Sequence, residues 1–117
     1  MAAKDELGRR GERLAEAHLV ALGYSMLDRN WRCSHGEIDL IARDGDEVAF
    51  VEVKTRSSVA FGHPFEAITA AKLARLRRLA IVWSSEHPRA GRIRIDVIAI
   101  VAPRTGQPTV EHLKAVF

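Results

Sequence analysis

The residues best suited to chemistry lie within positions 36–55, which read GEIDLIARDGDEVAFVEVKT. Asp39 is followed further along by Glu52, and Lys54 stands two residues beyond Glu52. Paired carboxylates are ligands that Mg²⁺ and similar hard cations prefer. A metal ion at such a pair lowers the pKa of bound water, and a nearby lysine stabilises charge on a phosphate under attack. The pattern Asp…Glu-x-Lys therefore indicates metal-dependent phosphodiester hydrolysis.

Two predicted strands, residues 37–43 and 48–55, must position these side chains. The dipeptide Asp44-Gly45 between them is a hairpin signal. The second strand is rich in valine and contains Phe50, which is typical of a buried, central strand. Charged residues on such a strand are costly unless they are paired or bound to a metal ion.

The hairpin loop decides whether the charged residues meet. Alternate residues of a strand share a face, so Glu37 lies with Asp39, and Glu52 lies with Lys54. With a loop of four or two residues, Asp39 lies opposite Glu52 and Glu37 opposite Lys54. The Cβ atoms of Asp39 and Glu52 are then roughly 5 Å apart. A three-residue loop without a bulge would place the two sets on opposite faces.

A plainer interpretation of the same residues is the solvated polar face of an amphipathic hairpin. Its cross-strand ion pairs would each contribute little to stability. The apolar character of the second strand counts against this interpretation. So does the excess of acids, because Glu37, Asp39 and Glu52 share one lysine, Lys54. Chemistry alone leaves both interpretations open.

The remaining pattern predicts helices and further strands around the hairpin. Residues 5–22 carry an apolar stripe at helical spacing, and Thr69 can cap a second helix that runs to residue 85. Strands are expected at residues 24–31, 92–102 and 109–117, with Arg92, Arg94 and Asp96 alternating against apolar neighbours. The order αβββαββ predicts an α/β fold, a mixed central sheet flanked by helices.

Composition narrows the class of protein. The 117 residues are enough for one domain, and the net charge of +3 fits a nucleic-acid partner without requiring one. Cys33 is the single cysteine, and no apolar stretch approaches the ~20 residues of a membrane span. No secretory signal stands at the N-terminus. We therefore expect a cytoplasmic protein without membrane association.

Two segments, GEIDLIA at residues 36–42 and FVEVKTR at residues 50–56, resemble the PD-(D/E)xK nuclease superfamily. This superfamily includes restriction endonucleases and archaeal Holliday-junction resolvases. The sequence resembles most closely the YraN-like family of small bacterial proteins, whose function is uncharacterised, and the resemblance covers almost the whole chain. It implies a restriction-endonuclease-like sheet in a single nuclease-like domain, residues 1–117. Ile38 stands where the superfamily pattern has proline.

The resemblance also implies roles for particular residues. Asp39 and Glu52 would be catalytic carboxylates that hold Mg²⁺ or Mn²⁺, and Lys54 would be the catalytic lysine. Glu12 on the first helix matches a further metal ligand of the resolvases, and Glu37 is an additional candidate without an assigned role. The implied activity is a DNA endonuclease acting on branched or structured DNA. The alternative is a catalytically silent nucleic-acid-binding protein with a nuclease fold.

Basic residues near the predicted site are candidates for contacts with the nucleic-acid backbone. They are Arg56, Lys72, Arg75 and Arg78. The plain alternative for each is a solvated helix face. A homodimer is expected by analogy with resolvases that cut symmetrically. Trp31 and Trp83 are expected in the core, because an aromatic content of 6% is thin for a surface that stacks on bases.

Overall fold

A mixed sheet forms the centre of the computed structural model, which describes residues 3–116. Within these residues the sheet has five strands in the spatial order β1-β2-β3-β4-β5, which is also their order in the chain. The strands are β1 (Ser25–Cys33), β2 (Gly36–Asp44), β3 (Glu47–Arg56), β4 (Arg92–Val101) and β5 (Thr109–Leu113). β3 pairs with β4 in parallel, and the other neighbours are antiparallel. The predicted α/β class and the order αβββαββ are confirmed.

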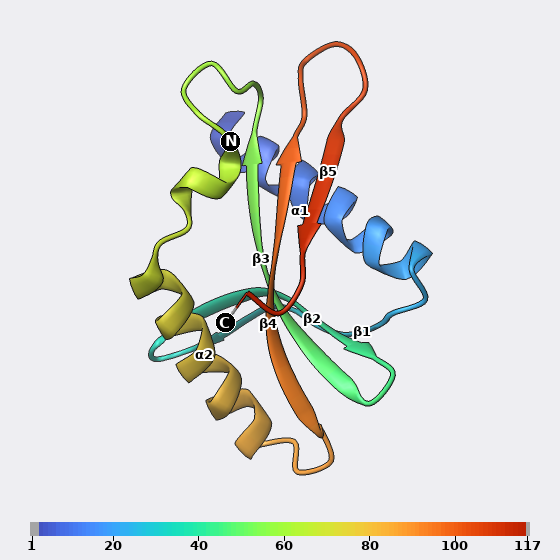
Figure 1. The fold of residues 1–117 in the computed structure, drawn as a ribbon, viewed down its shortest axis with the longest axis vertical. Coiled ribbons are helices and arrows are strands. Elements are labelled where there is room, and N and C mark those ends of the chain that lie inside the picture. The colour runs from blue at the N-terminus through green and yellow to red at the C-terminus, as the bar shows by residue number, and fades with distance from the viewer. Residues whose placement is uncertain (1–2, 117) are drawn as a thin grey trace.

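Helices α1 (Ala3–Ala21) and α2 (Ala70–Ser85) cover opposite faces of this sheet (Figure 1). Side chains of β3 alternate between two apolar clusters, since Val51 packs with α1 and Phe50 with α2. Both faces of β3 are therefore buried, as its sequence predicts. A short 3₁₀ helix, η1 (Pro64–Ala67), precedes α2 and was not predicted. The Thr69 side chain caps α2 by accepting a hydrogen bond from the Lys72 amide, as expected.

The sheet forks between β2 and β3. The pair Arg43 and Val48 forms as predicted, but the paired part of the ladder ends at Leu40 and Val51. The predicted register is therefore confirmed, but the ladder ends before it reaches Asp39 and Glu52 or Glu37 and Lys54, so these residues do not form backbone pairs. Beyond the fork β2 stays with β1 and swings away from β3 (Figure 1). The Val53 amide, freed from the ladder, donates instead to the carboxylate of Asp39 at 2.8 Å.

Strand β4 is buried on both faces from Arg94 onward, so Arg94 and Asp96 do not face water, whereas Arg92 at its start is exposed. The Asp96 side chain is 0% exposed and that of Arg94 8% exposed, and they are joined by an Nε–Oδ1 contact of 3.0 Å. Arg94 also contacts Asp44 and Glu47 and donates to the Tyr24 hydroxyl. This pairing is required, because an unpaired charge at this depth would cost several kcal/mol.

The final strand is shorter than predicted. β5 ends at Leu113, where residues up to 117 were expected. Ala115 adopts a left-handed φ of 53°, and its amide donates to Asp96. The Val116 amide then bonds to the carbonyl of Ile95 on β4. The chain thus turns away from the edge to satisfy a buried carboxylate, while the predicted last residue, Phe117, lies outside the described residues.

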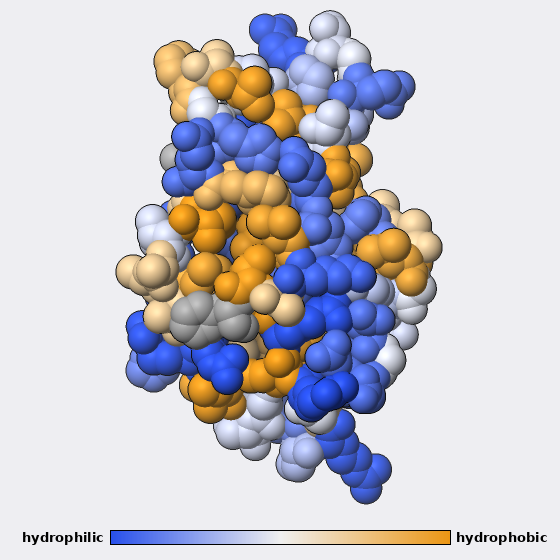
Figure 2. Space-filling model, viewed as in Figure 1, coloured by the Kyte–Doolittle hydropathy of each residue, from blue (hydrophilic) through white to orange (hydrophobic). Residues whose placement is uncertain are grey.

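The surface on the α2 side is mixed. Apolar side chains gather between α2 and β5, beside a largely hydrophilic area (Figure 2). A hollow of about 240 Å³ lies there, lined by Phe65, Ile68, Leu73, Val97, Leu113 and Val116. Within residues 3–116, no helix is long and apolar enough to cross a membrane.

Candidate active site

The fork between β2 and β3 brings the carboxyls of Asp39 and Glu52 into one space. Burial raises the pKa of Asp39 to about 7, and the negative charge of Glu52 adds to the rise. Glu12 and Glu37 raise the pKa further, whereas the hydrogen bond from the Val53 amide opposes the change. The predicted carboxyls are therefore close enough to affect each other's ionisation even though their backbones do not pair.

Lys54 lies beside Glu52, because residues two apart on a strand share a face. Its Nζ atom is 3.5 Å from Glu52 Oε1, and the two side chains are 29% and 17% exposed. Burial raises the pKa of Glu52, while the charges of Lys54, and then of Lys72 and Arg75 on α2, oppose the rise. The site thus joins buried acids to cations from both β3 and α2.

The two outer glutamates are held by Asn30 of β1. Its side-chain amide donates to Glu12 Oε1 and to Glu37 Oε1, each at 3.0 Å. Glu37 also accepts a hydrogen bond from Arg32. Asn30 has a left-handed φ of 48°, a conformation in which asparagine is enriched. Sequence reasoning gave Asn30 no role, although an asparagine inside a strand-like run is a signal for such a backbone position.

A close approach of α1 to β3 places Glu12 at the fork. A Cβ atom added to Gly11 would lie 2.8 Å from Cβ of Thr55 and still closer to its hydroxyl. Side chains essentially never approach so closely, so only glycine permits this helix position. The neighbour of Gly11 in the chain, Glu12, is thereby brought to within hydrogen-bonding distance of Asn30.

The chemistry of these side chains fits a hard divalent cation. Among residues 3–116, no three aspartate, glutamate, histidine or cysteine side chains are grouped to hold a metal ion as they stand. Mg²⁺, however, commonly binds proteins through one or two carboxylates and keeps several waters. Asp39 and Glu52 supply such a pair of oxygen ligands, and a cation between them would relieve the repulsion that raises the pKa of Asp39.

Basic residues flank the fork on both sides. Arg75 and Arg78 line a pocket of about 270 Å³ with His35 and Val82. Lys72 lies nearer the first turn of α2 and donates to the carbonyl of Ala67. These predicted cations lie along one helix, and both Lys72 and Arg75 are close enough to Glu52 to lower its pKa.

Two further observations concern cations outside α2. Arg56 ends β3, and its buried Nε atom has no hydrogen-bond partner among residues 3–116. On the α1 side, Arg9 and Arg13 line a pocket of about 170 Å³ together with Glu12 and Asn30. Sequence reasoning missed Arg9 and Arg13, because nothing in helical spacing shows which face of α1 meets the fork.

Comparison with known proteins gives a consistent result. A family model described as "Uncharacterised protein family UPF0102" matches residues 11–100. A UPF0102 protein of Beutenbergia cavernae is 57% identical over 117 residues, covering 99% of each chain. Another, from Arthrobacter sp. (strain FB24), is 56% identical over 117 residues, again 99% of each chain. A third, from Frankia casuarinae, is 50% identical over 118 residues, 100% of each chain.

These relatives match at full length and carry no named activity. The α/β architecture described above is consistent with a restriction-endonuclease-like fold. Since the family model matches most of the sequence, the chain belongs to the UPF0102 family of YraN-like proteins.

Proposed function

We propose that this protein is a metal-dependent endonuclease that hydrolyses phosphodiester bonds of DNA. The observation that carries the proposal is that Asp39 and Glu52 lie close enough at the fork to interact electrostatically, with Lys54 Nζ 3.5 Å from Glu52. Two half-buried acids on neighbouring strands, with one lysine beside them, exceed what simple ion pairing needs. Hydrolysis of a phosphodiester gives each of these groups a chemical task.

The three residues would divide the work as follows. Asp39 and Glu52 would hold Mg²⁺ or Mn²⁺, with Glu12 as a further ligand, and the ion would lower the pKa of the attacking water. Lys54 would orient that water or stabilise the charge that develops on the phosphate. The proton on Asp39 must be lost before it can bind the ion, since only the carboxylate is a good ligand.

The substrate follows from charge and from the resemblance. Exposed cations at the fork, Arg75 and Arg78 on α2 and Arg9 and Arg13 on α1, suit the phosphate backbone. Branched or structured DNA is the preferred substrate by analogy with the resolvases. A homodimer belongs to the same proposal, because a symmetric cut in a branched substrate needs two sites. Light scattering of the purified protein with DNA would measure the oligomeric state.

The direct test is cleavage with Mn²⁺ of linear, nicked and four-way DNA. We expect Glu52→Gln and Lys54→Ala each to lower the rate at least about 100-fold, as losses of electrostatic stabilisation do. Asp46→Asn is the control, because this side chain lies at the opposite end of the hairpin and is 81% exposed. Intact substrates throughout, or variants that cut as fast as the parent protein, would refute the proposal.

A nucleic-acid-binding protein without turnover is the second candidate. The observation that favours it is that Glu12 and Glu37 are held by Asn30, while no three ligand side chains are grouped for a metal among residues 3–116. A calorimetric titration with Mn²⁺ separates the candidates. No heat of binding, together with retained DNA binding, would favour the silent protein.

A further inference from the structure

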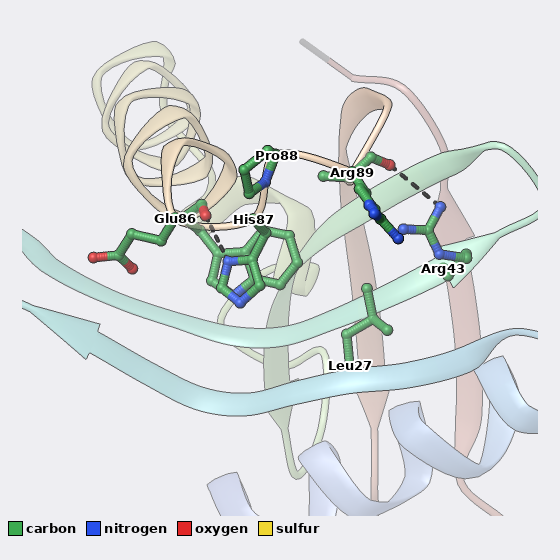
Figure 3. Close-up of a pocket in the computed structure, with 8 residues that line it drawn as sticks. Leu27, Arg43, Glu86, His87, Pro88 and Arg89 are labelled. Carbon is green, nitrogen blue, oxygen red and sulfur yellow. Dashed lines mark hydrogen bonds between the residues drawn. The ribbon is translucent and has the colours of Figure 1, made fainter.

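Another recess lies at the C-terminal end of α2, away from the fork. It has a volume of about 490 Å³ and lies where the last turn of α2 and the following loop meet β1 and β2 (Figure 3). Its walls are formed by Leu27, Arg43, Trp83, Glu86, His87, Pro88, Arg89 and Ala90. Pockets of 300–1,000 Å³ typically hold small organic ligands, so the space exceeds what an inorganic anion needs.

One wall of this pocket is aromatic and firmly held. The ring of His87 stacks on that of Trp83 with centroids 3.7 Å apart and an angle of 10° between the planes. His87 Nδ1 lies 2.7 Å from the Trp83 carbonyl, which fixes the imidazole. Trp83 is 3% exposed and its indole N–H is directed at Asp28 of β1. Trp83 thus belongs to the core, as predicted, while His87 is exposed.

The opposite wall is cationic. Arg43 and Arg89 lie together across the pocket from His87 (Figure 3). Arg43 donates one N–H to the carbonyl of Ala90 at 3.2 Å, and its guanidinium has further N–H groups to offer. In the ion pairs found among residues 3–116, neither arginine takes part. Glu86, the acid of the lining, directs its carboxylate away from them (Figure 3).

The aromatic wall suits a planar ring, and the cationic wall suits a strongly anionic group. Guanidinium forks match phosphate oxygens, and two of them match a phosphomonoester, which carries about −1.5 to −2 charge at pH 7. A monocarboxylate would leave one positive charge unbalanced. Leu27, which is 39% exposed, and Pro88 add apolar surface between the walls. A purine or pyrimidine ring fits such surroundings.

We propose that this pocket binds a nucleoside monophosphate unit, with the base against the His87 and Trp83 wall and the phosphate on Arg43 and Arg89. The unit could be a free nucleotide or the phosphorylated end of a strand. Arg43 is four residues from Asp39 along β2, so the Cα atoms of these two residues are about 13 Å apart. The proposal requires neither a metal ion nor cleavage, and it goes beyond the proposed endonuclease.

The test uses the fluorescence of Trp83 in the full-length Trp31→Phe variant, in the presence of EDTA. The probes are deoxyadenosine monophosphate, a short 5′-phosphorylated oligodeoxynucleotide, deoxyadenosine and inorganic phosphate. We expect saturable quenching by one or both phosphorylated probes, with at least about tenfold weaker binding of the nucleoside and of phosphate alone. Preference for the oligonucleotide would assign the pocket to a strand end, and preference for the mononucleotide to a free ligand.

Variants locate the binding. Arg89→Gln and His87→Ala should each lower the affinity for the phosphorylated probe about tenfold or more. Arg89→Gln removes a contact with the phosphate, and His87→Ala removes a contact with the base. Arg104→Gln, an exposed arginine in the 102–108 turn, is the matched control for lost charge. Arg43→Gln would also break the hydrogen bond to the Ala90 carbonyl and so disturb the loop itself. Arg89→Gln is therefore the variant that decides whether the cationic wall binds phosphate. No quenching by either phosphorylated probe, or equal affinity of the Arg89 and Arg104 variants, would overturn the proposal whatever the cleavage assay shows.

Discussion

Asp39 is a residue whose ionisation the fold changes strongly. Its pKa is about 7 in the folded protein, against an ordinary value of 3.8. The folded state therefore binds this proton more tightly than the unfolded chain does. Between these two values the free energy of unfolding falls as pH rises, and the loss is complete above pH 7. A carboxyl kept at such a cost is typical of a functional site.

Asp39→Asn removes the charge but keeps an oxygen that can accept from the Val53 amide. At pH 8 in EDTA, we expect this variant to raise the free energy of unfolding by about 1–3 kcal/mol. Near pH 4 the difference should shrink towards zero, because the parent carboxyl is then protonated. Urea denaturation at both pH values measures the effect. Asp46→Asn should show no such dependence on pH, and an equal effect of Asp39→Asn at both values would contradict the pKa assignment.

Residue types allowed part of the site to be predicted. Asp39, Glu52 and Lys54 could be named because carboxylates and a lysine on a buried strand are conspicuous. No role could be assigned to Asn30 or Gly11, since neither carries charge. Their importance comes from contacts between segments far apart in the chain. The side-chain amide of Asn30 is shared by Glu12 and Glu37, and Gly11 lets α1 lie against Thr55.

At the scale of secondary-structure elements, the contact of α1 with β3 sets the geometry of the fork. Gly11→Ala would force α1 away from Thr55, and we expect it to lower the free energy of unfolding by about 1–3 kcal/mol. Gly8→Ala is the matched control on the same helix, because nothing lies within 4 Å of its added Cβ. Since alanine has a higher helix propensity than glycine, Gly8→Ala should instead raise the free energy of unfolding by up to about 1 kcal/mol.

Thermal or urea unfolding of both variants provides the measurement. A further variant, Thr55→Ala in the Gly11→Ala background, should recover part of the loss, because it removes the clashing hydroxyl and methyl groups and leaves only the Cβ contact at 2.8 Å. If the two glycine variants behaved alike, steric contact between α1 and β3 would not be the reason for Gly11. Displacement of α1 should also lower cleavage activity, because it moves Glu12.

The order of the helices and strands could be predicted from hydrophobic periodicity, whereas the residues at which they end could not. β2 leaves β3 early because the Asp39 side chain takes over the Val53 amide. β5 stops early because the buried Asp96 carboxylate takes the Ala115 amide. In both places a side chain from another segment competes with the backbone ladder. Local propensity does not contain that information.

At the scale of the whole molecule, the net charge of +3 matters less than where the cations lie. Arg75 and Arg78 are exposed on α2 and line one pocket. If each contacts a phosphate, the double variant Arg75→Gln/Arg78→Gln should bind DNA with a weaker dependence on salt. The negative slope of the logarithm of the association constant against the logarithm of salt concentration should become less steep by about 1.8. Titration of a labelled duplex at several salt concentrations measures this slope.

The double variant Arg92→Gln/Arg104→Gln is its control, since it removes the same charge and leaves α2 intact. We expect a nearly unchanged slope for this protein. Equal slopes for the two double variants would show that binding responds to total charge rather than to the α2 surface, and would place the DNA elsewhere.

The parallel pairing of β3 with β4 has a consequence for how the chain folds. β1, β2 and β3 meet through short turns, whereas β3 reaches β4 only across residues 57–91, which include α2. Hairpins close in microseconds, and parallel pairs must wait for their crossover. Asp39 and Glu52 belong to the local hairpin, and Lys72 and Arg75 arrive with the crossover helix. Lys54, on β3, therefore joins Glu52 with the local hairpin, whereas the charges of Lys72 and Arg75 reach Glu52 only at the later stage at which the crossover helix packs.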